Sequence, residues 1–141
     1  MRQKLTLPDG YEVLSQGAGT HDVLIRTAVK KEIEAQASTE QRAELSELLK
    51  RFIQHGVQGL GRNKFNGKEG WFPGERAPGK VRLQAFKPWQ LRAYGFLRQF
   101  GERPTFIITG VDCSKKADKA KQSVLKAAGG EAYRLNSELN G

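Results

Sequence analysis

The first half of the chain carries hydrophobic residues at helical spacing. Ser38 and Gln41 form a capping box, in which each side chain accepts a hydrogen bond from the backbone N–H of the other residue. Beyond this box, apolar residues recur at the spacing of one buried helical stripe: Leu45, Leu48, Leu49, Phe52 and Ile53. Gly56 suits a left-handed C-cap. The pattern predicts a helix from the Ser38 cap to Gly56.

Two shorter elements are predicted before this helix. Residues 11–14 follow a Pro-Asp-Gly turn and predict a first strand. Residues 22–35 place Val23, Val29 and Ile33 among charged residues, and we interpret them as a helix. This helix and the next are expected to pack against each other as a hairpin.

The second half of the chain alternates apolar and polar residues at strand spacing. Alternation over 81–86 and 89–94, the segment 96–100 and the apolar run 106–108 predict antiparallel strands. If Trp89 and Leu91 face the core, then Gln90, Arg92 and Tyr94 share the opposite, exposed face. A last helix is predicted over 114–128, ending at Gly129-Gly130, with lysines on its outer side.

These elements predict a single α+β domain over residues 1–141. A strand and a helix hairpin come first, a small antiparallel sheet follows, and a basic helix ends the chain. The helices are expected on one side of the sheet. Between the hairpin and the sheet, residues 56–80 hold seven glycines and several cations, which predicts a long, mobile, basic loop. Trp71 and Phe72 in this loop favour anchoring to the core over stacking on a base.

The positive charge lies in the second half of the chain. Residues 1–55 hold eight Lys/Arg and eight Asp/Glu, whereas residues 56–141 hold sixteen and seven, which accounts for the whole net charge of +9. A one-sided cationic surface favours a polyanionic partner, and nucleic acid is the commonest polyanion in a cell.

Other classes of protein are disfavoured by composition. Cys113 is the single cysteine, so it forms no internal disulfide, and with His21 and His55 it assembles no metal-ligand spacing. No metal or other cofactor is therefore expected. No apolar stretch reaches membrane-spanning length, and the first residues lack the pattern of a secretory signal. We expect a cytoplasmic protein without membrane partners.

The order of the second-half motifs resembles the RelE/ParE toxin superfamily. The motifs are Phe86-Lys87-Pro88-Trp89-Gln90-Leu91-Arg92-Ala93-Tyr94, then Arg98, then the strand 105–111, then Ser114-Lys115-Lys116 before an Ala-rich helix. They are most similar to the HigB-like branch, often of phage origin. The resemblance covers about residues 40–135.

This resemblance implies the toxin of a type II toxin–antitoxin system. Such toxins are metal-independent endoribonucleases that enter the ribosomal A site and cut messenger RNA there. The implied partners are the ribosome, its message and a cognate antitoxin of helix-turn-helix type. The implied chemistry is attack by a ribose 2′-OH on the adjacent phosphodiester, which basic side chains assist by neutralising charge at phosphorus.

The resemblance also implies site residues. Three positions match catalytic cations of the family: Arg92, Arg98 and Lys116. Further side chains are expected to hold nucleic acid: Lys64, Lys68, Lys80, Arg82, Tyr94, Lys115 and Lys119. No residue matches a general base, and Gln122 stands near the place where some members carry a tyrosine.

Two other functions stay open. A toxin of the same fold could inhibit DNA gyrase by binding the protein, as the ParE branch does, without an arginine cluster for phosphate. A basic module could bind RNA or DNA without cleaving it, and its binding would then depend strongly on salt with no cleavage products.

Overall fold

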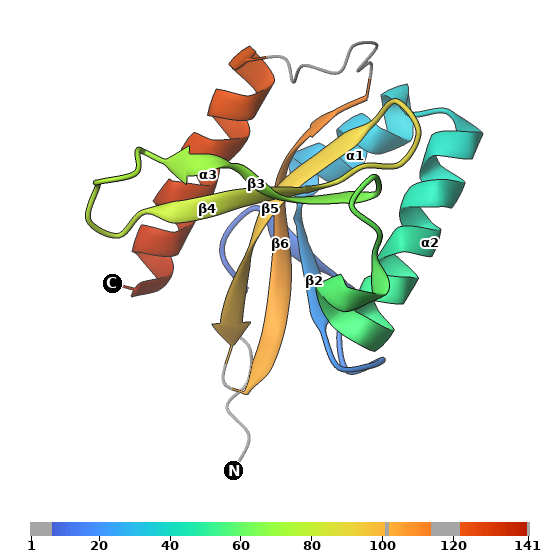
Figure 1. The fold of residues 1–141 in the computed structure, drawn as a ribbon, viewed down its shortest axis with the longest axis horizontal. Helices are drawn as coiled ribbons and strands as arrows, with labels where there is room; N and C mark the ends of the chain where they lie inside the picture. The colour runs from blue at the N-terminus through green and yellow to red at the C-terminus, as the bar shows by residue number, and fades with distance from the viewer. Residues whose placement is uncertain (1–6, 101, 114–121, 141) are drawn as a thin grey trace.

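The computed structural model describes residues 7–100, 102–113 and 122–140, and it forms a six-stranded sheet between helices (Figure 1). The strands are β1 (Tyr11–Ser15), β2 (Asp22–Arg26), β3 (Phe65–Phe72), β4 (Val81–Phe86), β5 (Arg92–Phe100) and β6 (Arg103–Asp112). The helices are α1 (Thr27–Gln36), α2 (Thr39–His55), a short 3-10 helix η1 (Gly56–Gly59) and α3 (Gln122–Asn140).

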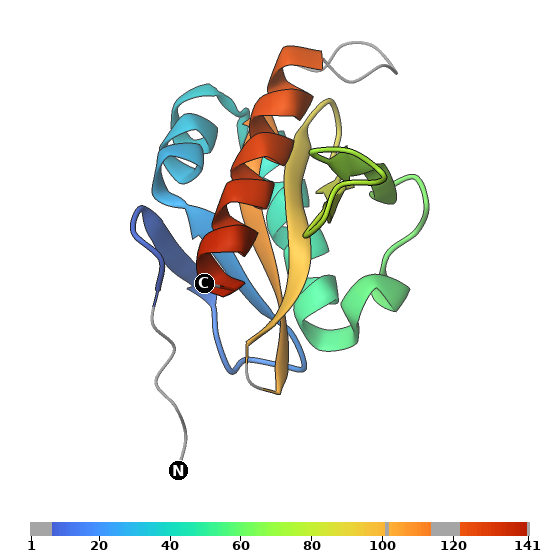
Figure 2. The ribbon, with the colours of Figure 1, turned by 90° about the vertical axis from the view of Figure 1, so that its left-hand side faces the viewer.

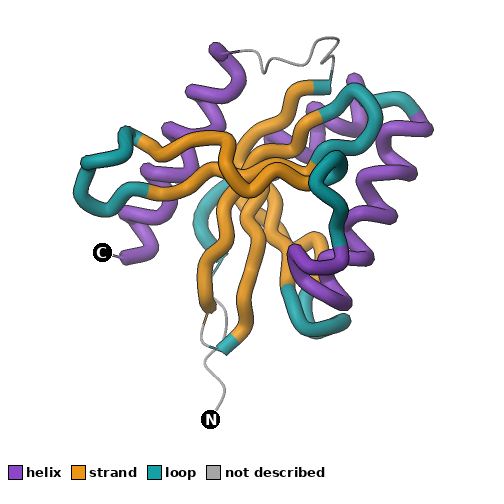
Figure 3. Tube along the Cα trace, viewed as in Figure 1, coloured by secondary structure: helices purple, strands orange, loops and turns teal. Residues whose placement is uncertain are grey.

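The sheet is mixed, with strand order β1-β2-β6-β5-β4-β3. Its strands run through the middle of the molecule, with helices on either side (Figure 3). Neighbouring strands are antiparallel except for β2 and β6, which run parallel because α1, α2 and the later strands intervene between them. β6 lies in the middle of the sheet and is almost entirely buried. An α+β fold with a mostly antiparallel sheet and a C-terminal helix is therefore confirmed.

One face of the sheet packs against α1 and α2. Phe52 of α2 makes edge-to-face ring contacts with Phe86 of β4 and Phe106 of β6. The start of α2 is fixed by the predicted capping box, in which Ser38 Oγ accepts from the Gln41 amide and Gln41 Oε1 accepts from the Ser38 amide. The predicted helix 38–56 is confirmed.

The opposite face packs against α3, as the side view shows (Figure 2). The buried residues of this helix are small or aliphatic: Ala128, Gly129, Ala132 and Leu135. A Cβ on Gly110 of β6 would come within 2.5 Å of the Ala128 Cβ, and one on Gly129 would come within 2.4 Å of the Phe72 ring. Such short distances show how closely the helix and the sheet approach.

Several predictions about elements are wrong. Helices cover both faces of the sheet rather than one side. The predicted helix 22–35 is β2 followed by α1, because buried Val23–Ile25 pair with the central strand β6. The predicted loop 56–80 contains η1 and β3.

Two further boundaries differ. The predicted strands 89–94 and 96–100 form one strand, β5, with an irregularity between Tyr94 and Gly95. In the last helix, residues 114–121 lie outside the described residues, and the described part continues through Gly129-Gly130 to Asn140. A glycine at position 129 leaves space for the Phe72 ring and does not end the helix.

The two neighbouring glycines of α3 should respond oppositely to alanine. We expect Gly129→Ala to lower the free energy of unfolding by about 1–3 kcal/mol, because the new methyl group would overlap the Phe72 ring. A Cβ on Gly130 would meet no other part of the protein within 4 Å, so Gly130→Ala should stabilise by about 0.5–1 kcal/mol through helix propensity. Urea unfolding of both variants measures this, and equal effects at the two positions would contradict the packing argument.

Candidate functional site

Strand β5 carries two of the three predicted catalytic cations. Arg92 and Arg98 are six positions apart, and Tyr94 and Phe96 between them pack in the α3-side core. Both arginines therefore lie on the face of β5 that α3 covers. The structure brings them to one strand and one face, but gives them different surroundings.

Arg92 forms an ion pair with Glu69 of β3. Its Nη1 donates to both Glu69 carboxylate oxygens at 3.1 and 3.3 Å, and the Arg92 and Glu69 side chains are only 13% and 6% exposed. Asp112, the last residue of β6, is the register partner of Arg92 and is buried. Glu69, Arg92, Asp112 and Tyr94 are called the acid–arginine cluster below.

Tyr94 is fully buried within the acid–arginine cluster, so its predicted exposure is wrong, and its contact with nucleic acid stays a prediction. The reason is that α3 covers the face of β5 that the sequence pattern assigned to solvent. Burial, reinforced by the negative charge of Glu69, raises the pKa of the Tyr94 hydroxyl to about 12. Tyr94 is therefore a neutral hydroxyl near two carboxylates and a guanidinium.

Trp89 is also placed differently from its prediction. It is 58% exposed, because Pro88 to Leu91 form a turn in which Gln90 has a φ of 53°, and β5 begins only at Arg92. Leu91 is buried as expected. The turn is held from α2, since Glu44 accepts from the Trp89 amide and Gln41 Nε2 donates to the Gln90 carbonyl.

Arg98 caps the C-terminal end of α3. Its Nη1 donates to Asn136 Oδ1 and to Asn140 Oδ1, both at 2.7 Å, and its Nη2 donates to the Leu139 carbonyl at 3.4 Å. A cation at this end of a helix interacts favourably with the free carbonyls and with the helix dipole. Contact of Arg98 with a phosphate stays a prediction. The structure shows that Arg98 also caps the C-terminal end of α3.

The other predicted cations gather on the β3–β4 hairpin or lie outside the described residues. Lys80 Nζ and the Arg82 guanidinium each lie 4.4 Å from the centre of the Trp71 ring, and Lys68 is exposed nearby on β3. Lys64 is paired with Glu44 of α2 instead. Three predicted residues lie outside the described part of the chain: Lys115, Lys116 and Lys119.

The segment that contains the β3–β4 hairpin has a positive net charge. Residues 56–100 hold nine Lys/Arg and two Asp/Glu, a net charge of +7. Phe72 of the hairpin anchors to α3, as predicted, whereas its neighbour Trp71 contacts the cations. The two side chains of this pair therefore serve opposite faces of β3.

Two residues of the acid–arginine cluster, Glu69 and Asp112, are not among the site residues predicted from the sequence. A signal existed for each: Glu69 is one of only two acids within residues 56–100, and Asp112 ends the central strand two residues before Ser114-Lys115-Lys116. Cys113, next to Asp112, is buried, which raises the pKa of its thiol to about 11. A thiol that stays protonated is a poor nucleophile.

The described residues contain no group of three or more His, Cys, Asp and Glu side chains able to hold a metal ion. No helix in the described ranges is both long and apolar enough to cross a membrane.

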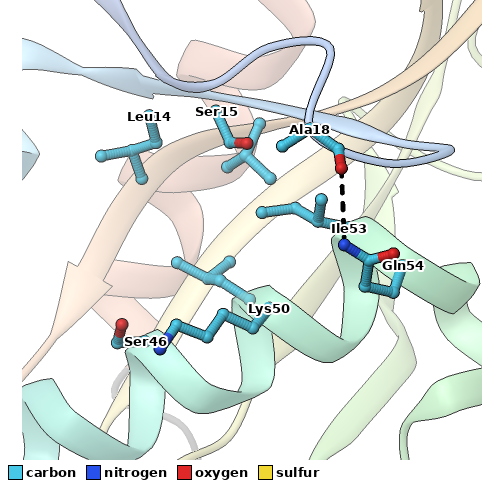
Figure 4. Close-up of a pocket in the computed structure, with 9 residues that line it drawn as sticks. Leu14, Ser15, Ala18, Ser46, Lys50, Ile53 and Gln54 are labelled. Carbon is cyan, nitrogen blue, oxygen red and sulfur yellow. Dashed lines mark hydrogen bonds between the residues drawn. The ribbon is translucent and has the colours of Figure 1, made fainter.

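An open groove of about 360 Å³ lies on the other side of the molecule, between α2 and the β1–β2 connection (Figure 4). Its apolar lining includes Leu14, Leu49 and Ile53, and Lys50 also lines it. The Gln54 side-chain amide donates a hydrogen bond to the Ala18 carbonyl. None of the described residues predicted for the site lines this groove.

Comparison of the chain with protein-family models, with curated proteins and with solved structures gives no match.

The Arg92–Glu69 pair should contribute to stability. We expect Glu69→Gln to lower the free energy of unfolding by roughly 1–3 kcal/mol, because a mostly buried guanidinium loses its ionic partner. Glu75→Gln is a matched control, since Glu75 is exposed on the same hairpin, and it should change stability by less than about 0.5 kcal/mol. Denaturant unfolding checks both, and an unchanged Glu69→Gln midpoint would contradict the pairing.

Proposed function

We propose that this protein is the toxin of a type II toxin–antitoxin system and cuts messenger RNA on the ribosome without a metal. The observation that carries the proposal is the acid–arginine cluster. In it, Arg92 from the Trp-x-Leu-Arg motif meets the carboxylate of Glu69 and faces Asp112 across β5 and β6. The motif order described above and the α+β fold support the same proposal.

The cluster contains the types of group that the reaction requires. A carboxylate can remove the proton from a ribose 2′-OH, and the 2′-oxygen then attacks the adjacent phosphorus. The bond from phosphorus to the 5′-oxygen breaks, and the leaving oxygen takes up a proton. The products are a 2′,3′-cyclic phosphate and a free 5′-OH.

The roles follow from charge and position. Arg92 would bind the non-bridging phosphate oxygens and stabilise the charge that develops on them, since a guanidinium can donate two parallel hydrogen bonds. Glu69 and Asp112 are the two carboxylates from which the general base is drawn. Lys116, which follows Asp112 by four residues in sequence, would add a second cation. The RNA backbone would be held by the cations of the β3–β4 hairpin.

One observation favours a second candidate, a basic module that binds RNA without cleaving it. The guanidinium of Arg98 is engaged by α3, and that of Arg92 is engaged by Glu69. The exposed cations of the hairpin would then be the functional feature. Gyrase inhibition has no specific observation in its favour.

Primer extension on a translated message tests the proposal. In a purified translation system we expect wild-type protein to cut at defined codon positions only when ribosomes are present. Arg92→Gln should reduce cutting by roughly 100-fold or more, because one electrostatic contact to a transition state contributes at this scale. Arg42→Gln on exposed α2 is the matched control and should cut like wild type.

The structure dictates two precautions. Removing Arg92 alone leaves Glu69 without its ionic partner, so the charge-neutral double variant Glu69→Gln/Arg92→Gln is measured beside it, with thermal unfolding of each. Arg98→Ala is a poor diagnostic, because losing the α3 cap would reduce activity through the fold. If wild-type protein leaves the message whole while translation continues, cleavage is refuted. Retained RNA binding would then favour the second candidate.

A further inference from the structure

Strands β4 and β5 separate part-way along the sheet. They pair only over Gln84–Phe86 and Ala93–Gly95, and beyond that point β4 continues into the hairpin while β5 turns away beside β6 (Figure 1). A cavity of about 260 Å³ lies where the strands part. We refer to it as the wedge.

The wedge has apolar walls and a cationic rim. Its apolar lining comes from Val81 of β4 and from Phe96 and Leu97 of β5. Lys80 and Arg82 provide two exposed cations, and Asn136 of α3 closes the inner end. Leu97 is 39% exposed, so part of this apolar lining is open to solvent. The combination suits a flat, partly apolar ring that carries negative charge beside it.

Trp71 holds the two cations in place at the rim. Both lie 4.4 Å from its ring centre, and Arg82 is its register partner across β3 and β4. Phe72 packs on α3, so Trp71 and Arg82 point away from that helix, toward the open face of the hairpin. A guanidinium held over an indole ring is preorganised for phosphate contact.

One residue that lines the wedge, and one that bonds to a lining residue, each have a buried polar atom without a hydrogen-bond partner among the described residues. Gln84 lines the wedge; its Nε2 donates to the Gly67 carbonyl at 3.3 Å, while its Oε1 is buried and unpaired. Arg98 Nε is also buried and unpaired, and Arg98 bonds Asn136 of the wedge. Unpaired buried acceptors and donors are rare, and a ligand is one way in which they become satisfied.

We propose that the wedge binds one unpaired nucleotide of an RNA strand. The base enters between Arg82 and the Phe96–Leu97 wall, with Gln84 available to its polar edge, and the adjoining phosphates lie on Lys80 and Arg82. Trp71 is a positioning residue that acts through these cations. The choice of RNA as ligand rests on the proposed function, but binding at the wedge requires no cleavage.

An acidic protein segment is a poorer occupant. It would satisfy Lys80 and Arg82, but it would bring no flat ring for the apolar walls and no edge for the Gln84 amide. Single-stranded nucleic acid offers all three features in one repeating unit. The small volume admits one ring system rather than a folded element.

Fluorescence of Trp71 tests the proposal without ribosomes. The chain has two tryptophans, so a Trp89→Phe background leaves Trp71 as the single reporter. Short unstructured oligouridine should change its emission on binding. Leu97→Phe fills the wedge without altering charge, and we expect it to weaken oligouridine binding roughly tenfold. Leu14→Phe is the matched control, because Leu14 is equally exposed in the distant groove.

A second probe separates the contribution of the phosphates to binding from that of the base. Inorganic polyphosphate presents phosphates without bases, so Leu97→Phe should leave its affinity unchanged. Arg82→Ala should weaken both probes and lower the salt slope by roughly 0.7, whereas Arg42→Ala should do neither. The Trp71 variants lack the tryptophan reporter, so their binding is followed by the fluorescence anisotropy of dye-labelled oligouridine. Trp71→Leu should weaken oligouridine binding as Arg82→Ala does, and Trp71→Phe should recover most of the loss because it restores an aromatic face.

The outcomes are decisive in either direction. Equal affinity of Leu97→Phe and wild type for oligouridine overturns the wedge. So does a polyglutamate peptide that binds more tightly than oligouridine and is sensitive to Leu97→Phe. If messenger RNA is not cut but the wedge variants behave as expected, the proposed enzyme fails while the RNA subsite stands. If messenger RNA is cut but Leu97→Phe does not change oligouridine binding, the RNA subsite fails while the proposed enzyme stands.

Discussion

The close approach of α3 to the sheet is the constraint on which the rest of this structure depends. Gly110 has no room for a Cβ against Ala128, Gly129 has none against Phe72, and the Thr109 hydroxyl donates to the Ala128 carbonyl at 2.9 Å. Contact at this distance contributes to burying β5 on both faces over residues 93–96. Helix α3 covers the acid–arginine cluster. Its C-terminal end accepts hydrogen bonds from Arg98, and Gly129 contacts Phe72 of the hairpin. A larger residue at either glycine would therefore disturb the site as well as the core.

Enclosure by α3 divides the positive charge into two kinds. Arg92 and Arg98 lie under or beside the helix and have protein partners, so part of their electrostatic field is neutralised within the fold. Lys68, Lys80 and Arg82 point to solvent on the hairpin, where Trp71 contacts the latter two. A polyanion would therefore reach these hairpin cations more readily than it would reach Arg92 and Arg98. The interior arginines would act afterwards, at shorter range and in a lower dielectric.

The sequence was informative where one local rule determined the structure. The helix after Ser38 has a capping box and a single apolar stripe, and both are present. It misled where tertiary packing overrode local pattern. Asp22–Arg26 looks helical because its neighbours are, yet its apolar run pairs with β6. Gly129-Gly130 looks like a helix end but provides space for Phe72. Tyr94 looks exposed because alternation cannot reveal a helix on the second face. The sequence predicts a loop at Glu69 and Trp71, and a loop prediction does not indicate which residues across the sheet they contact.

Arg98 links the helix cap to the wedge. Its prediction as a phosphate ligand and its observed position on α3 look incompatible, because Nη1 and Nη2 already donate to the helix end. Yet Asn136, which accepts from Arg98, also lines the wedge, and Arg98 Nε has no partner among the described residues. A nucleotide in the wedge would lie against the amide that orients this guanidinium. A ligand that donated a hydrogen bond to Asn136 Oδ1 would compete with Arg98 for that oxygen, and occupancy of the wedge would then be coupled to the position of the α3 end through a single side chain.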